Sequence, residues 1–191
     1  MEVVETELPG VLVVEPKVFG DDRGFFEEVF QAERYAGHGI GKHPDGELRP
    51  FVQFNHSRST AGILRGLHFQ EPKAQGKLIW VVRGALLDVA VDVRRGSPTF
   101  AKWISVELSA DNHRQIWIPP GYAHGFWVLR DDTDCMYACT DYYAPDCEQI
   151  IRWDDPQIGI EWPGGHPTLS ERDLRAPVLA EAATLPAYQA P

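Results

Sequence analysis

Several features that mark whole classes of protein are missing from this sequence. Its 191 residues contain no apolar run approaching the roughly 18 residues that a membrane-spanning helix needs. The N-terminus lacks a basic stretch followed by an apolar run, so no secretory signal is expected. Neither a Walker-type phosphate loop nor a G-x-G-x-x-G dinucleotide motif occurs. These absences argue against a membrane protein and give no sign of a dinucleotide cofactor.

Positive charge and cysteine are both scarce. Eighteen Lys and Arg residues stand against 28 Asp and Glu, which gives a net charge of −10. Such a balance disfavours non-specific binding to nucleic acid or anionic membranes, although a small anionic ligand needs only a local basic pocket. The three cysteines (Cys135, Cys139 and Cys147) form no C-x-x-C pair, which disfavours a structural metal site. We therefore expect free thiols in a reducing cytoplasm.

The residues that are present indicate an all-β fold. At 43% hydrophobic and 24% charged, the composition is that of a globular domain. Short apolar or alternating runs recur between turn signals, at residues 11–16, 25–30, 51–57, 63–70, 78–82, 86–93, 101–108, 115–118, 125–129 and 135–142. Many short strands at regular spacing are typical of a sandwich or barrel. We expect one domain over residues 1–185 and a loose tail over residues 186–191.

Helix is expected in only two places. One is near residues 31–35, and the other is in the alanine-rich C-terminal end. In that end Ser170 is followed three residues later by Asp173, which resembles a capping box at a helix start. These helices would be short and peripheral to the strands.

Two histidine motifs suggest chemistry. Residues 119–126 read Pro-Pro-Gly-Tyr-Ala-His-Gly-Phe, the P-x-G-x-x-H spacing of cupins, small β-barrels that often hold a metal. The matching cupin motif would supply two ligands as H-x-H, whereas this chain reads His68-Phe69-Gln70. Because imidazole titrates near pH ~6.5, His68 and His124 can act as bases at neutral pH. Acid–base chemistry without a metal is the favoured interpretation.

The alternation of residues 63–70 predicts which side chains lie together. With a period of two, Arg65, Leu67 and Phe69 share one face of the strand, and Gly66 and His68 share the other. A bulge would shift this pattern.

Each remaining candidate has a structural interpretation beside a functional one. Lys77 is either solvated or a stabiliser of an oxyanion. Arg23, in a tight turn, forms either a weak surface ion pair or a bidentate phosphate contact. Tyr137 and Tyr143 either pack or act as proton donor and stacking platform, and Asp173 is by default a first-turn helix charge. The same holds for His68 and His124, and the residues alone leave these alternatives open.

Taken together, the motifs resemble the dTDP-4-dehydrorhamnose 3,5-epimerase family of nucleotide-sugar enzymes over roughly residues 12–177. The segments that carry the resemblance are 16–26, 64–70, 75–77, 88–92, 97–100, 119–126, 140–145 and 158–163. The resemblance implies a cupin-type jelly roll (a double-stranded β-helix) with short peripheral helices. It also implies a homodimer whose N-terminal strands contribute to the partner's site.

Residue roles follow from the resemblance. His68 would be the general base, Asp173 the carboxylate that orients it, Tyr137 the acid on the opposite face, and Lys77 the group that steadies an enolate. A second set would bind substrate: Arg65 and His124 at the sugar, Arg23 and Arg172 at the pyrophosphate, Glu28, Gln53, Asn55 and Glu148 in polar contacts, and Tyr143 stacked on thymine. No metal and no cofactor is implied.

The expected activity is cofactor-free 3,5-epimerisation of dTDP-4-dehydro-6-deoxy-D-glucose to dTDP-4-dehydro-L-rhamnose, a step of dTDP-L-rhamnose biosynthesis. Residues 129–136 vary between relatives and precede Tyr137, so a 3- or 5-epimerase that acts at one carbon is an alternative. A metal-dependent cupin and a non-catalytic nucleotide-sugar binder are two further alternatives. Bound metal after purification would indicate the cupin, and ligand binding without solvent exchange would indicate the binder.

Overall fold

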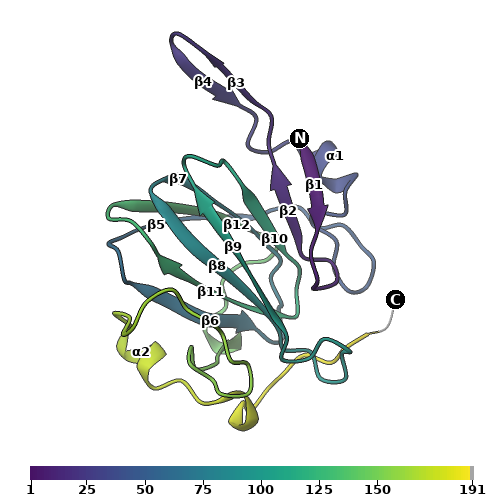
Figure 1. Ribbon diagram of the computed structural model, residues 1–191. Coiled ribbons are helices and arrows are strands. Elements are labelled where there is room, and N and C mark those ends of the chain that lie inside the picture. The colour runs from purple at the N-terminus through teal and green to yellow at the C-terminus, as the bar shows by residue number, and fades with distance from the viewer. Residues whose placement is uncertain (190–191) are drawn as a thin grey trace.

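The strands form a two-sheet β-sandwich with a projecting hairpin (Figure 1). The structure is a computed structural model that describes residues 1–189. One sheet runs in the order β1 (Glu2–Glu5), β2 (Leu12–Glu15), β10 (Gln115–Ile118), β7 (Lys77–Arg83), β12 (Thr133–Cys139) and β5 (Gln53–Ser59). The other runs in the order β13 (Glu148–Ile150), β6 (Leu64–Gln70), β11 (Tyr122–Val128), β8 (Ala85–Asp92) and β9 (Trp103–Ser109). The hairpin is β3 (Val18–Asp21) with β4 (Gly24–Glu27).

All strand pairs are antiparallel, and the all-β prediction is confirmed. Each of the ten predicted runs overlaps a strand, and these strands are β2, β4 and all those from β5 to β12. Strands β1, β3 and β13 were not predicted. They are three or four residues long, and their sequences, EVVE, VFGD and EQI, show no alternation of apolar and polar residues.

The core lies between the two sheets, but both sheets are also covered outside. Ile79 of β7 packs in the central core, whereas the alternate residues Leu78 and Trp80 pack in a second cluster with Tyr35 of α1 (Ala32–Ala36). On β8, Ala90 faces the central core and its neighbours face a third cluster beneath the C-terminal segment. Burial on both faces explains why these strands read as continuous apolar runs.

The helix predicted near residues 31–35 is confirmed as α1. It begins after Gln31, and the Gln31 side chain accepts a hydrogen bond from the Arg34 N–H at 2.5 Å. The capping residue Ser170 is confirmed as well. It precedes α2 (Glu171–Leu174) and its hydroxyl accepts from the Asp173 N–H at 3.1 Å.

As far as residue 189, the alanine-rich end is otherwise not helical. This described part contains only the single turn η2 (Leu179–Glu181), at which the Leu179 N–H donates to buried Asp155 at 2.6 Å. A short alanine-rich segment is a marginal helix alone, so docking against the sheet outweighs its propensity. Another 3₁₀ turn, η1 (Pro145–Cys147), precedes β13.

The tail is held further along than expected. The backbone N–H of Arg95 donates to the Pro186 carbonyl at 2.8 Å, and the Arg95 carbonyl accepts from the Tyr188 N–H at 2.9 Å. Residues 186–188 are therefore held against the domain, whereas a loose tail was expected from residue 186. Residues 190–191 lie outside the described part. Across residues 1–189, no helix combines the length and apolarity that a membrane crossing requires.

Candidate active site

Two adjoining cavities contain most of the candidate residues. The first, of about 440 Å³, is lined by Arg65, His68, Lys77, His124, Tyr137, Arg172 and Asp173, among others. The second, of about 330 Å³, is lined by Gln53, Asn55, Tyr143 and Glu148, among others. His68, Lys77 and Tyr137 line both. The two cavities therefore form one continuous site.

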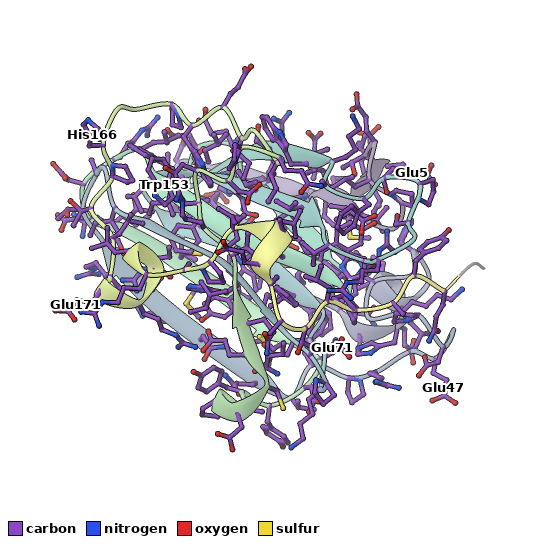
Figure 2. The ribbon with its side chains drawn as sticks, turned by 90° about the horizontal axis from the view of Figure 1, so that it is seen from below. Glu5, Glu47, Glu71, Trp153, His166 and Glu171 are labelled. Carbon is purple, nitrogen blue, oxygen red and sulfur yellow. The ribbon has the colours of Figure 1, made fainter. Side chains whose placement is uncertain are left out.

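Strand register brings these side chains together from distant parts of the chain. His68 on β6 is the cross-strand partner of His124 on β11. In the other sheet, Tyr137 on β12 pairs with Asn55 on β5. Lys77 begins β7. Each sheet thus supplies one wall of the first cavity. The α2 segment supplies Asp173 and lies at the surface, with Glu171 pointing outward in Figure 2.

The structure corrects the predicted faces of β6. Arg65 and His68 were expected on opposite faces, yet both line the first cavity. The register between β6 and β11 shifts between His124 and Phe126, opposite Gly66. Such an irregularity breaks strict alternation and turns both side chains to the same side.

His68 and Asp173 form a hydrogen-bonded dyad. The distance between His68 Nε2 and Asp173 Oδ1 is 2.5 Å, and Asp173 is buried with 3% exposure. The Ser170 hydroxyl donates to the other carboxylate oxygen at 2.9 Å. Burial opposes ionisation of Asp173, but these bonds and the charge of nearby Arg172 outweigh it and lower the pKa of the carboxyl. An ionised carboxylate accepts only, so Nε2 carries the proton and Nδ1 is left as the basic atom.

Lys77 and Tyr137 supply a cation and a neutral acid. Burial lowers the pKa of the Lys77 ammonium. Within residues 1–189, no carboxylate lies within 4.0 Å of it to form an ion pair, so the charge is free to meet a ligand. Burial raises the pKa of Tyr137 to about 12. Its phenol therefore remains protonated at neutral pH and can donate a proton.

A second histidine–carboxylate pair lies beside the first. His124 Nε2 is 2.8 Å from Asp88 Oδ2, and the Asp88 side chain is fully buried. Burial raises the pKa of Asp88, and its other oxygen has no hydrogen-bond partner within the described residues. Sequence reasoning gave Asp88 no role. The available signal was that Asp88 is one of two carboxylates, with Asp92, inside the apolar run at residues 86–93.

The second cavity is polar at its mouth. Gln53 accepts the Tyr143 N–H at 2.8 Å, and the Tyr143 hydroxyl donates to Glu148 at 2.7 Å. Arg172 forms an ion pair with the same Glu148 carboxylate. Tyr143 is 48% exposed, so a planar group can stack on its ring.

Two predicted residues, Arg23 and Glu28, lie apart from both cavities of their own chain. Arg23 is at the tip of the projecting hairpin (Figure 1), where it pairs with Asp21. Glu28, just beyond β4, pairs with Arg34 at 2.6 Å.

The residue at the altered cupin ligand position has a structural task. Gln70 donates to the Lys73 carbonyl at 2.8 Å and accepts from the Ala144 N–H at 2.9 Å. Across residues 1–189, no group of three or more His, Cys, Asp or Glu side chains is placed to hold a metal ion. The absence of a metal and a cofactor stays a prediction.

Comparison with known proteins agrees with this arrangement. The family model described as dTDP-4-dehydrorhamnose 3,5-epimerase matches residues 5–181. A curated dTDP-4-dehydrorhamnose 3,5-epimerase of Shigella flexneri is 50% identical over 95% of this chain and 98% of its own.

Two solved structures are also similar. The dTDP-6-deoxy-D-glucose-3,5-epimerase of Legionella pneumophila, in complex with dTDP-4-keto-L-rhamnose, has a TM-score of 0.92 and 48% identity, covering 99% of both chains. ChmJ, a 3'-monoepimerase of Streptomyces bikiniensis in complex with dTDP-quinovose, has a TM-score of 0.88 and 39% identity, covering 96% of this chain and 92% of that one. The cupin-type fold is thereby confirmed, and this chain belongs to the dTDP-4-dehydrorhamnose 3,5-epimerase family.

Proposed function

We propose that the protein catalyses the 3,5-epimerisation of dTDP-4-dehydro-6-deoxy-D-glucose to dTDP-4-dehydro-L-rhamnose without a cofactor, in dTDP-L-rhamnose biosynthesis. The name of the curated relative and the ligand of the Legionella structure support this substrate class. The observation that carries the proposal is that the His68–Asp173 dyad, Lys77 and Tyr137 all line one cavity.

The chemistry begins with loss of a proton next to a ketone. The hydrogens on C3 and C5 flank the C4 carbonyl, so removing either leaves an enolate with its charge on the C4 oxygen. His68 Nδ1 takes the proton, and the Tyr137 phenol returns one to the same carbon from the opposite face. Net inversion results when base and acid act on different faces.

Lys77 lowers the barrier by meeting the developing charge. Its ammonium lies in a buried site, where an electrostatic contact is worth more than in water. Asp173 stabilises the imidazolium that forms on His68 and keeps the ring in one orientation, as the carboxylate of a hydrolytic triad does.

The surrounding residues would hold the nucleotide sugar. Arg65 and His124 contact the sugar in the first cavity. Arg172, which lines the first cavity and pairs with Glu148 of the second, meets the pyrophosphate. In the second cavity Tyr143 stacks on the thymine. Polar contacts to sugar and nucleotide come from Gln53, Asn55 and Glu148.

We also propose a homodimer in which the β3–β4 hairpin reaches the partner's cavities. The hairpin exposes Phe19, Phe25 and Phe26 at 54%, 63% and 70%, and burying such aromatics drives association. Arg23 and Glu28 would thereby join the partner's substrate site. We place the reaction in the cytoplasm, where the free cysteines stay reduced.

An epimerase that acts at one carbon is the second candidate. The similarity to ChmJ, described as a 3'-monoepimerase, favours it. Such an enzyme would use the same base and enolate, with reprotonation from the opposite face at one carbon only.

Deuterium incorporation separates the candidates. The protein is incubated with dTDP-4-keto-6-deoxyglucose in D2O, and label at C3 and C5 is read by NMR, with a reductase trap for the rhamno-configured product. Label at both carbons with that product supports the 3,5-epimerase. Label at one carbon supports the second candidate, and no label while dTDP still binds would refute both.

A further inference from the structure

The base of the β3–β4 hairpin contacts His113, which lies in the loop between β9 and β10 of the β-sandwich. The distance between His113 Nδ1 and Glu27 Oε2 is 3.2 Å, and the two side chains are 18% and 17% exposed. The Phe25 ring meets the imidazole edge-on, with centroids 4.8 Å apart. Phe25 and Glu27 alternate along β4 and so share one face of the hairpin. His113 therefore contacts that face of the hairpin, while Phe25 remains 63% exposed.

The loop that carries His113 is built to hold it. His113 has φ +57°, in the left-handed region that is uncommon for residues other than glycine and in which Asn, Asp and His are enriched. Neighbouring Asn112 fixes the loop, since its side-chain oxygen accepts the N–H groups of Ser109 and Arg114 at 3.0 Å each. These two hydrogen bonds fix the backbone on both sides of His113 and so fix the direction of its imidazole.

Glu27 needs this partner. Its Oε2 atom is buried and has no hydrogen bond within the described residues. A buried carboxylate oxygen is costly unless a cation or donor compensates it. The His113 imidazole is the group in ion-pair distance.

The opposite face of the hairpin is free. Phe19 and Phe26 are cross-strand partners on that face and are 54% and 70% exposed. At the tip, Asp21 accepts the Arg23 N–H at 2.9 Å and pairs with its guanidinium. The hairpin thus has a base that contacts His113, an exposed aromatic face, and the ion-paired guanidinium of Arg23 at its tip.

We propose that His113 is a positioning residue that sets the direction of the hairpin through Glu27 and Phe25, and so sets where Arg23 lies in the nucleotide cavity of the partner subunit. The inference rests on the proposed homodimer. It assigns a role to three side chains, His113, Glu27 and Phe25, that line neither cavity.

The test measures dTDP affinity by calorimetry together with KM and kcat. H113N keeps a side chain suited to the left-handed conformation and removes the imidazole, and E27Q keeps the shape and removes the charge. Each should weaken dTDP binding and raise KM about three- to tenfold, the loss expected for one hydrogen-bonded contact, with kcat unchanged. R23A should do the same, and H113N/R23A should be no worse than R23A. H166N, at an exposed histidine of the loop before α2 (Figure 2), is the matched control and should bind normally.

Weaker binding in R23A with normal binding in H113N and E27Q would overturn the positioning role and leave the proposed function intact. The positioning role would also be overturned if H113N weakened dTDP binding as much in the R23A background as it does in the unmodified protein. His113 would then act by a route other than Arg23. Dissociation of H113N to monomers in light scattering would overturn the positioning role as well. Normal dTDP binding by R23A would refute the hairpin's reach into the partner, whereas turnover by the unmodified protein tests the reaction separately.

Discussion

Replacing Asp173 by Asn tests the central feature of the site. The substitution keeps the shape of the side chain and its ability to accept a hydrogen bond from His68 Nε2, now 2.5 Å away, but removes the negative charge. The partner that stabilises the His68 imidazolium is therefore lost, while the cavity keeps its form.

The expected loss of exchange rate follows from the strength of the hydrogen bond between His68 and Asp173. A hydrogen bond to a charged group contributes about 1.5–3 kcal/mol, and each ~1.4 kcal/mol is a factor of ten in rate. We expect D173N to slow deuterium exchange at C3 and C5 by roughly 10- to 150-fold. S170A is the graded control, because Ser170 holds the same carboxylate with a neutral donor at 2.9 Å. Loss of that bond should slow exchange only about 2- to 12-fold.

The assay is the rate of solvent deuterium uptake into dTDP-4-keto-6-deoxyglucose, with dTDP affinity measured in parallel. Exchange by D173N at the unmodified rate, with dTDP bound normally, would refute the dyad. The same pair predicts a stability effect. The pKa of Asp173 is lowered in the fold, so its contribution is complete above the unfolded value of about 3.9. That contribution is lost as pH falls through the lowered folded pKa, and D173N should lack this part of the acid sensitivity in denaturant titrations.

The other predictions concern the remaining groups of the site. H68A should abolish exchange at both carbons while dTDP binding by calorimetry stays near normal. Y137F should still take up solvent deuterium, because His68 can deprotonate the substrate, but it should fail to invert the carbon, which NMR of the product resolves. Y143A should weaken dTDP binding by about 1–3 kcal/mol, the range for a stacked base. Because burial lowers the pKa of Lys77, turnover should fall as pH rises through a value below the usual lysine range of about 10.4, and in K77R this alkaline limb should move upward.

Each of these has a clear contrary result. Turnover retained by H68A would remove His68 as the base, and normal product yield from Y137F would remove the phenol as the acid. Equal dTDP affinity in Y143A and the unmodified protein would exclude stacking. An alkaline limb that stays in place in K77R would show that another group sets it.

Local patterns carried much of the fold. Alternation and turn residues identified ten of the strands, and Ser170 marked the start of α2, because these signals act within a few residues of chain. As far as residue 189, the helix predicted in the alanine-rich end beyond α2 does not form, because long-range contacts decide the structure there. Contacts of Leu179 and Arg95 with distant segments fix its path, and such contacts leave no periodic trace in the sequence.

The sequence by itself determined the family motifs and the types of residue needed for proton transfer, since those depend on side-chain chemistry in short segments. Only the tertiary structure decided which of them meet. It joined His68 to Asp173 across 105 positions of chain, turned Arg65 to the same side as His68 through a register shift, and placed Asp88 beneath His124. It also set Arg23 apart on the hairpin. Packing of two sheets creates these proximities, and no local pattern encodes the distance between residues on different strands.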